Sequence, residues 1–531
     1  MAPLRLLWCL CTIQASLRPH NAAPPGPTRP AAHESSSSHE KRLKEDSLGS
    51  VSRPAFSAFA SLPGPPTVAA TPKTDLSNAT EPCILTGLVN AFEGIPDDLL
   101  TKTGGKVRVD IWPVDGGPCP AKDGGVIIGP TLVPVAADRV LPLLRETQRG
   151  YHAYIRHLDL NSFPDVADRL PLKRAKRLCG PRIKSANLWL GDGRVQSAVH
   201  WDGHDNLLLQ LEGRKRVLLL PPDAVSVLGF RRFQYHAWCL SSDELDTIGR
   251  GGSMAPAFSE HEHCKADVEN HCTFDAFRAT ATLPPSIERR AYLAVLEPGQ
   301  ALFVPALWHH AVASEPDPAS GLNCAANLWF VLGTAAHDAA LRKTPAWPEA
   351  LFCLAAAKRS LGDPRAAVQA YERALKLRPA MTDAKHNLAA ALAEAGDLKA
   401  AVARFEANVG GDAAEEARRL SGLGVVYKRQ NRLEDAAAAF DASLQLVEDS
   451  RTMVYRGNVA ALLGDLPDAE RRLAAAAAAA LKPRDRADAL NSRGVVLEAL
   501  DRPGDAADCY DRALDAVPGH AKARANRDAL L

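Results

Sequence analysis

A short unit recurs through the C-terminal third of this 531-residue chain, and it limits the fold of that region more than any other feature. A Gly-Asp pair precedes an Ala-rich segment at Gly362, at Gly396, 34 residues later, and again at Gly464. Large apolar side chains follow at similar offsets, spaced by 34, 35, 33 and 37 residues: Tyr371, Phe405, Phe440, Leu473 and Tyr510. This period is typical of helix-turn-helix units that stack because none buries its apolar face alone. We therefore expect an all-α solenoid over residues 346–531.

These repeats resemble the tetratricopeptide family. The family's pattern of small, aromatic and proline positions is matched by Gly362, Ala367, Tyr371, Ala374 and Pro379. The third and fourth units follow the pattern loosely, so their register is left open. The resemblance implies a superhelix whose concave face binds a protein or peptide, either a substrate or a partner. A tail that only dimerises or stabilises the chain is the alternative, and the oligomeric state is not predicted.

The first 80 residues are expected to form a leader and a linker. Arg5 precedes an apolar run over residues 6–13, and no acidic residue occurs before Glu34. This pattern is typical of a secretory signal or an organelle transit peptide. We expect the secretory pathway ahead of an organelle, and otherwise a soluble cytoplasmic chain. Residues 20–80 are rich in Pro, Ser and Ala, which predicts a disordered linker.

Residues 81–338 have the pattern of a β domain. Residues 106–112 alternate like a half-buried strand, and residues 207–211 and 216–220 flank a Glu-Gly-Arg turn as in a hairpin. Many short strands with little helix indicate a barrel or a sandwich. Residues 223–290 interrupt this pattern and are expected to form a long insertion.

The overall charge and hydropathy disfavour some partners and locations. The net charge is +1, so there is no basic surplus to neutralise a phosphate backbone, and we expect no nucleic-acid partner. No segment approaches the 18 or so consecutive apolar residues of a membrane span, so we expect none.

The residue types of a metal site occur within the β region. His200 and Asp202 are separated by one residue, so on a strand both side chains point to the same side. A second apolar strand after residues 298–300 is followed by His309 and His310. Two histidines and one carboxylate on one face of the ion form the facial triad of non-haem Fe(II) oxygenases. Barrel closure would have to bring the third ligand from its distant strand.

Two longer stretches carry a resemblance to a known family. Residues 191–222, with His200 and Asp202, and residues 297–314, with His310, resemble the JmjC-related cupin-like oxygenases. The resemblance covers residues 82–331 and implies a double-stranded β-helix with flanking helices. It also implies that His200, Asp202 and His310 hold iron, while His309 stands where the family usually has an aromatic residue.

The same resemblance places the cosubstrate, 2-oxoglutarate. It implies that Lys215 pairs with the distal carboxylate, because an ammonium pointing into a barrel requires an anion. The remaining positions that it assigns near the cosubstrate are Ser197, where Thr is usual, Asn206, Asn327 and Tyr154. Ordinary structural roles for these polar side chains are the alternative.

The sequence thus predicts an Fe(II)- and 2-oxoglutarate-dependent dioxygenase, a protein hydroxylase or a demethylase, followed by tetratricopeptide repeats. A catalytically inactive cupin scaffold and a metal cupin that acts on a small molecule without 2-oxoglutarate are the alternatives. The insertion could hold zinc, form a Cys264–Cys272 disulfide or be a solvated loop. Its candidate ligands are His261, His263, Cys264, His271 and Cys272.

Overall fold

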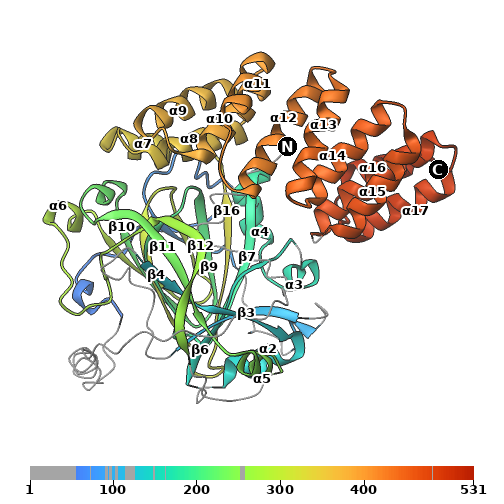
Figure 1. Cartoon of the computed structure of the whole chain (residues 1–531). Coiled ribbons are helices and arrows are strands. Elements are labelled where there is room, and N and C mark those ends of the chain that lie inside the picture. The colour runs from blue at the N-terminus through green and yellow to red at the C-terminus, as the bar shows by residue number, and fades with distance from the viewer. Residues whose placement is uncertain are drawn as a thin grey trace, which may run out of the picture. The chain divides into compact units, whose positions relative to one another are not determined.

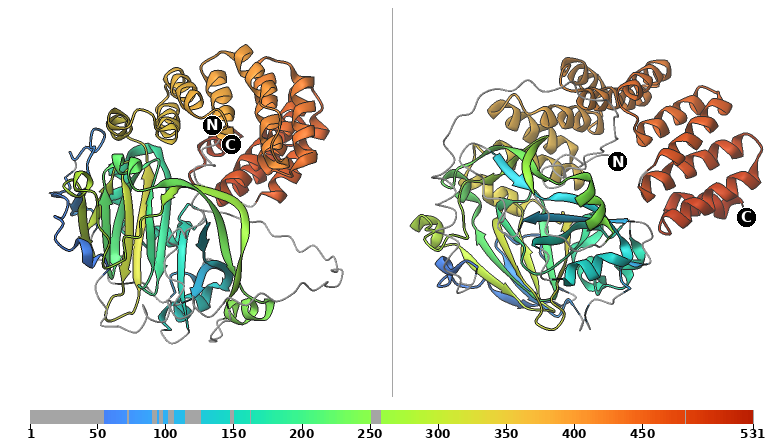
Figure 2. Two further views of the ribbon diagram at one scale, coloured as in Figure 1. Left: turned by 60° about the vertical axis from the view of Figure 1, so that its left-hand side comes forward. Right: turned by 60° about the horizontal axis from the view of Figure 1, so that its bottom comes forward.

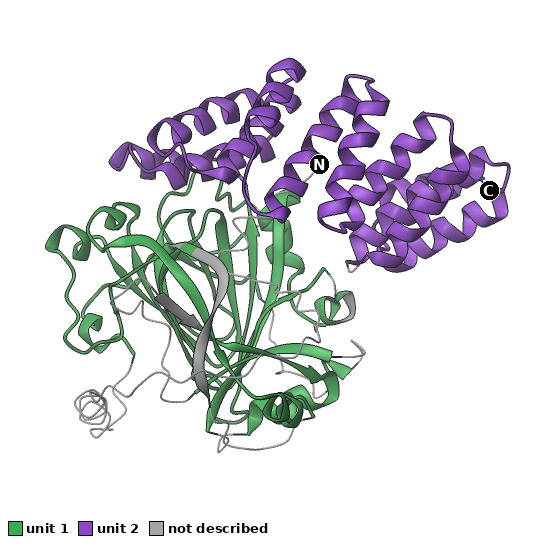
Figure 3. Ribbon diagram, in the orientation of Figure 1, with its two compact units in different colours: residues 1–330 green, residues 331–531 purple. Residues whose placement is uncertain are grey.

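A computed structural model describes residues 55–71, 73–89, 94, 98–101, 106–113, 126–146, 150–161, 163–250, 258–480 and 482–530. The chain divides into two compact units, residues 1–330 and residues 331–531 (Figure 3). The boundary therefore lies slightly before the expected one, because helix α7 (Ala335–Lys343) belongs to the second unit. The leader expected over residues 1–54 lies outside the described residues.

The expected linker ends earlier than predicted. Residues 55–71 contain the 3-10 helix η1 (Ser57–Phe59) and strand β1 (Thr67–Ala69). Phe56 and Phe59 are only 1% and 2% exposed, and they pack in one apolar cluster with Leu218. Disorder is thus wrong for this segment, because two phenylalanines bury enough apolar area to anchor it to the β-rich unit.

Two sheets build the first unit (Figure 1). The larger sheet has the order β1-β2-β14-β9-β16-β7-β6-β3-β5, and the smaller has the order β13-β10-β15-β8-β12-β11-β4. The other strands of the larger sheet are β2 (Cys83–Thr86), β3 (Lys106–Pro113), β5 (Thr131–Ala136), β6 (Tyr151–Asp159), β7 (Ile183–Gly191), β9 (Asp205–Glu212), β14 (Ala301–Val304) and β16 (Asn323–Phe330). The strands of the smaller sheet are β4 (Val126–Gly129), β8 (Gln196–Trp201), β10 (Arg214–Leu220), β11 (Phe230–Cys239), β12 (Ser259–Cys272), β13 (Tyr292–Leu296) and β15 (His309–Glu315).

Eight of these strands have the topology of a double-stranded β-helix (Figure 2). The successive strands β7 to β10 lie alternately in the larger and the smaller sheet, and β13 to β16 alternate in the same way. The core order is therefore β14-β9-β16-β7 in one sheet and β13-β10-β15-β8 in the other. This confirms the predicted fold of the β domain. The short helices of this unit are α2 (Ala137–Arg145), α3 (Pro164–Asp168), α4 (Lys173–Cys179), η4 (Gly180–Arg182), η5 (Pro222–Ser226), α5 (Ser242–Gly249) and α6 (Pro285–Glu288).

The insertion between β10 and β13 is largely strand. β11 and β12 pair with each other in antiparallel fashion, and β12 also pairs with β8 of the core. A solvated loop is therefore the wrong description of these two segments. The two strands were not predicted because their sequence is polar. Strands at the margin of a sheet do not need an apolar face, so the usual alternation is missing.

The second unit is entirely helical (Figure 1). After α7 its helices follow as α8 (Pro348–Ser360), α9 (Pro364–Leu377), α10 (Thr382–Glu394), α11 (Leu398–Ala407), α12 (Ala413–Arg429), α13 (Leu433–Leu446), α14 (Ser450–Leu462), α15 (Leu466–Ala479), α16 (Pro483–Ala499), α17 (Pro503–Ala516) and α18 (Ala521–Leu530). Each helix from α8 to α17 contacts the next along the chain, which is the stacking that the repeat period predicts.

The turns between the two helices of each pair share a left-handed backbone conformation. Gly362, Gly396 and Gly464 have positive φ angles of 90°, 95° and 86° where the first helix of a pair turns into the second. At the corresponding turns of two other pairs the chain has Asn431 and Asp501, with φ of 60° and 57°. Asn and Asp tolerate this left-handed conformation better than other non-glycine residues. The turn is thus kept although the Gly-Asp pair is missing.

Small residues allow the two helices of a pair to approach each other. A Cβ added to Gly424 would lie 2.7 Å from the ring of Phe440, and one added to Gly494 would lie 2.5 Å from the ring of Tyr510. Phe440 and Tyr510 belong to the recurring large side chains, and both are fully buried. The period of the sequence is therefore the period of this packing contact.

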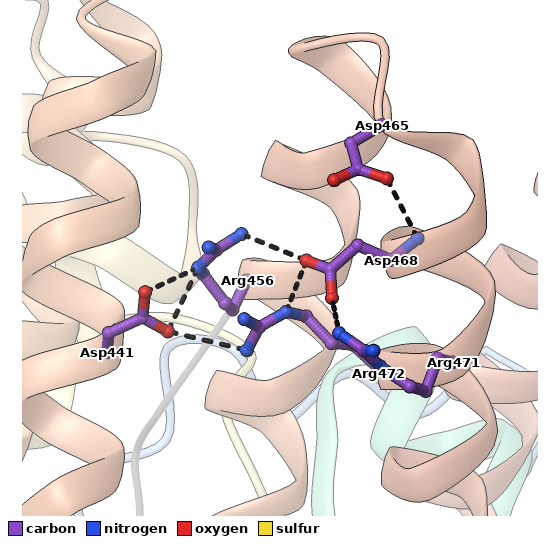
Figure 4. Close-up of polar contacts among 6 residues, drawn as sticks. All are labelled: Asp441, Arg456, Asp465, Asp468, Arg471 and Arg472. Carbon is purple, nitrogen blue, oxygen red and sulfur yellow. Dashed lines mark hydrogen bonds and ion pairs between the residues drawn. The ribbon is translucent and has the colours of Figure 1, made fainter.

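An ion-pair network joins α13, α14 and α15 (Figure 4). Arg456 Nε donates to both oxygens of Asp441 at 3.0 Å, and Arg472 Nε donates to Asp468 Oδ2 at 2.6 Å. Arg472 also lies 3.4 Å from Asp441, and Arg471 pairs with Asp468. The two carboxylates thus connect three successive helices of the solenoid.

In the described part of the chain, the helices are all too short or too polar to cross a membrane.

Candidate metal centre

His200, Asp202 and His310 meet in the interior of the β-helix. His200 lies near the end of β8, Asp202 follows that strand directly, and His310 is paired with His200 across β8 and β15. One ligand atom of each residue lies within 4.8 Å of those of the other two. The His310 Nε2 atom is 3.7 Å from Asp202 Oδ2, and the two imidazole centroids are 4.3 Å apart. The structure thus brings the three predicted ligands together.

Backbone carbonyls fix which imidazole nitrogens face the centre. His200 Nδ1 donates to the carbonyl of Ala198 at 2.8 Å, and His310 Nδ1 donates to that of Trp308 at 3.2 Å. A carbonyl only accepts, so each Nδ1 carries the hydrogen and each Nε2 keeps a free lone pair. Burial, and then the nearby His200, lower the pKa of His310, which keeps it neutral. Two imidazoles and one carboxylate are donors suited to a borderline divalent transition metal.

The neighbouring histidine points elsewhere. His309 is fully buried, and its ring lies 4.5 Å from the ring of Phe230, on the opposite face of β15 from His310. Burial is the main cause that lowers the pKa of His309 to about 3. His309 therefore packs where an aromatic residue would also fit, and it is not part of the cluster.

Lys215 lies on the same interior face as the metal cluster. On β10 and β15, Lys215 is paired with Ser314 and Leu219 is paired with His310. Alternate residues of a strand share a face, so Lys215 points to the same side as Leu219 and His310. Its side chain is 2% exposed, its Nζ donates to Ser314 Oγ at 2.6 Å, and Nζ lies 5.9 Å from the Tyr154 ring centroid. Within the described residues no carboxylate pairs with it. Burial consequently lowers the pKa of Lys215 to about 8.

Tyr154 can lie close to Lys215 because of a glycine on the next strand. Tyr154 on β6 is opposite Gly191 on β7, and a Cβ added to Gly191 would lie 2.4 Å from the tyrosine ring. Tyr154 is buried, and burial is the main cause that raises its pKa above the usual range. The predicted tyrosine is thus a neutral phenol beside the lysine.

Asn206 and Asn327 belong to a chain of polar side chains. Asn327 Nδ2 donates to Asn206 Oδ1 at 3.2 Å, and Asn327 Oδ1 accepts from Trp189 Nε1 at 2.7 Å and from Asn187 Nδ2 at 3.3 Å. Asn187 Nδ2 also donates to Ser185 Oγ at 2.7 Å. The structure therefore places both predicted amides in one interior network, where they also have structural partners.

A β-bulge brings Ser197 to the interior. Strict alternation would point Ser197 away from His200, three residues on. However, Ser197 is opposite Val312 and His200 is opposite His310. A step of three residues along β8 thus corresponds to a step of two along β15. Cross-strand partners share a face, and Ser197 therefore points to the same side as His200.

The insertion contributes a side chain to this region that the sequence had suggested for a separate zinc site. His271 on β12 is paired with His200, and the two rings stack at 5.4 Å with an angle of 15°. Cys272 is a buried free thiol, so the Cys264–Cys272 disulfide, one of the three alternatives, is not formed at this residue. The side chains of His261, His263 and Cys264 lie outside the described residues.

Trp329 and His157 also belong to this site, although neither was predicted from the sequence. Trp329 Nε1 donates to Asp202 Oδ2 at 3.0 Å, and the His157 ring stacks on Trp329 at 5.3 Å. A signal for Trp329 was present, because it lies two residues after Asn327 and so shares its face of β16. For His157 there was none, since its φ of 60° breaks the alternation of β6.

Family models match both units. A model described as a cupin-like domain matches residues 70–332, and a tetratricopeptide-repeat model matches residues 354–416 and 456–521. Together with the strand topology, these matches define a cupin-like domain of the JmjC type followed by tetratricopeptide repeats.

Among known proteins, the chain is similar to lysine-specific demethylase JMJ31 of Arabidopsis thaliana, with 30% identity over 149 residues, 28% of this chain and 21% of that protein. It is also similar to tRNA wybutosine-synthesizing protein 4 of Neurospora crassa, with 27% identity over 198 residues, 35% of this chain and 13% of that protein. The match thus spans less than a quarter of either relative. A solved tetratricopeptide protein of Thermus thermophilus aligns with a TM-score of 0.31 and 22% identity, over 35% of this chain and 98% of that one.

Proposed function

We propose that this protein is an Fe(II)- and 2-oxoglutarate-dependent dioxygenase that hydroxylates a protein substrate. The observation that carries the proposal is Lys215, a buried ammonium without a carboxylate partner among the described residues, on the same interior face as the His200–Asp202–His310 cluster. Burying an unpaired ammonium is costly, so such a group favours an anionic ligand. A metal cupin that binds no 2-oxo acid would not need a buried ammonium at this position.

The donor set fits Fe(II). His200, Asp202 and His310 would hold the ion through two Nε2 atoms and one carboxylate, which leaves positions open for other ligands. When bound there, Fe(II) with 2-oxoglutarate and O2 supplies the oxidation of a substrate C–H bond. A methyl group on nitrogen that is hydroxylated in this way is lost as formaldehyde, so hydroxylation and demethylation share this chemistry.

The residues of the chain orient the cosubstrate. Lys215 Nζ and Ser314 Oγ, already 2.6 Å apart, would both bind the distal carboxylate, the first through its charge. Tyr154 closes one side of the lysine and presents a neutral hydroxyl. Asn206 and Asn327 would present amide groups from the larger sheet. With its far end held, the 2-oxo acid is directed toward the cluster.

The second unit supports a polypeptide substrate. Stacked tetratricopeptide helices form surfaces that bind proteins or peptides. A modified nucleoside is a second candidate substrate, favoured by the similarity to the wybutosine-synthesizing protein. The assay separates the two: full-length protein with Fe(II) and 2-oxoglutarate should form more succinate when a protein fraction is added, and protease but not ribonuclease should remove this stimulation.

A binding experiment tests the centre without any substrate. Anaerobic addition of 2-oxoglutarate to the Fe(II)-loaded protein should produce the visible charge-transfer absorption of a chelated 2-oxo acid. His310→Ala should abolish the absorption, whereas the matched control His309→Phe should retain it, because His309 packs against Phe230. Wild-type protein that binds Fe(II) but never gains this absorption would contradict the proposal and favour a scaffold or a different metal cupin.

A further inference from the structure

Asp202 lies outside the strand ladder that orients the two histidines. It follows the last residue of β8, and its carboxylate is 16% exposed. A side chain on a strand is directed by the pleat, whereas one just beyond the strand end keeps more rotational freedom. The orientation of this carboxylate therefore depends on a specific partner.

Trp329 supplies that partner. Its indole Nε1 donates to Asp202 Oδ2 at 3.0 Å from β16, a strand of the opposite sheet. Trp329 is 9% exposed, so water competes little for the bond. Hydrogen bonds to an ionised acceptor are shorter and stronger than neutral ones, and an indole N–H only donates.

Two aromatic neighbours hold the indole in place. The His157 ring stacks on Trp329 at 5.3 Å and 26°, and it also lies 4.2 Å from the Trp189 ring. Trp189 also meets Trp329 edge to face at 6.3 Å. His157 adopts a φ of 60°, a conformation that a non-glycine residue keeps only where surrounding contacts require it.

Trp189 has a different hydrogen bond of its own. Its Nε1 donates to Asn327 Oδ1 at 2.7 Å, not to Asp202. The two tryptophans thus lie in one aromatic cluster but have separate acceptors: one is the metal-centre carboxylate, the other an amide of the proposed cosubstrate network.

We propose that Trp329 is a positioning residue that orients Asp202 for metal binding, and that His157 and Trp189 hold its indole for this purpose. The inference rests on the proposed metal centre, but it does not depend on which reaction the centre performs. Removing a partner that orients a ligand typically weakens metal binding by about 10- to 100-fold.

The test uses Co(II), which reports affinity and coordination by its visible absorption. Trp329→Phe keeps an aromatic ring but loses the N–H, so Co(II) should bind about 10- to 100-fold more weakly and the absorption bands should change shape. The matched control Trp189→Phe keeps an aromatic ring against Trp329 and removes only the N–H that donates to Asn327. Its Co(II) affinity and band shape should therefore remain those of the wild type. His157→Gly accepts a positive φ and removes only the stacked ring; it should weaken Co(II) binding even if Trp329→Phe fails to fold.

Two results would overturn the inference. One is a folded Trp329→Phe variant with the wild-type Co(II) dissociation constant and spectrum, and the other is an equal loss in Trp189→Phe. Failure of the proposed function looks different: wild-type protein would bind Co(II) and respond to Trp329→Phe as expected, yet 2-oxoglutarate would not alter its spectrum.

Discussion

Lys215→Met is expected to make the metal-free β-rich unit more stable while it removes the cosubstrate anchor. Burial lowers the pKa of Lys215 from 10.5 to about 8. At about 1.4 kcal/mol for each pH unit, the buried charge costs the folded state roughly 3 kcal/mol. Loss of the hydrogen bond to Ser314 Oγ offsets about 1 kcal/mol of the gain. The net stabilisation at pH 7 is therefore about 2 kcal/mol, which raises the Tm by about 4–8 °C.

The pH dependence follows from the direction of this pKa change. At pH 7 Lys215 is protonated in both the folded and the unfolded chain, so the cost is fully present. Between about pH 8 and the unfolded pKa of 10.5 the folded protein releases its proton first, and its stability rises with pH. The advantage of Lys215→Met over wild type should therefore shrink as the pH increases from 7 toward 10.

Scanning calorimetry of the metal-free full-length proteins at several pH values measures this difference. Ser314→Ala is the matched control, because it removes the hydrogen bond but keeps the charge, and it should lower the Tm. In the metal-loaded protein, Lys215→Met should weaken 2-oxoglutarate binding by about 10- to 150-fold, the value of one charge-assisted bond. A variant less stable than wild type at pH 7, or a Tm difference that does not change with pH, would refute the reasoning.

Three further predictions concern packing and charge. Gly424→Ala should destabilise the helical unit by about 1–3 kcal/mol, because its Cβ would meet Phe440; in thermal melts Gly504→Ala, with open space around it, should not. Phe59→Ala should lower the Tm of the β-rich unit by removing about 3–5 kcal/mol of core packing. An unchanged Tm would mean that residues 55–71 belong to the linker after all. Burial raises the pKa of Asp468, but its arginine partners lower it below 3.8 overall, so it stabilises the helical unit above pH 4 and less as the pH falls further. Asp468→Asn should remove part of this acid sensitivity in urea titrations from pH 6 to 3.

Features that depend on neighbouring residues could be predicted from the sequence. The helical pairs follow from the 34-residue recurrence, and the common side of His200 and Asp202 follows from their one-residue gap. Asn431 and Asp501 show the limit of such patterns, because the turn persists when its glycine is replaced.

Contacts between distant segments could not be predicted in this way. The polar strands β11 and β12 lacked an apolar face, and Phe56 and Phe59 appeared within a Pro- and Ser-rich stretch. Their order comes from partners far along the chain: β12 pairs with β8, and the two phenylalanines pack beside Leu218. Composition does not report such partners.

By itself, the sequence determined the repeat, the strand alternation and the types of side chain that the site contains. The tertiary structure alone decided that Ser197 shares a face with His200 and that Trp329 reaches Asp202. The physical reason is register: a bulge, or a shift of one residue between paired strands, reverses which side chains face the interior. That register is set by packing across the whole β-helix.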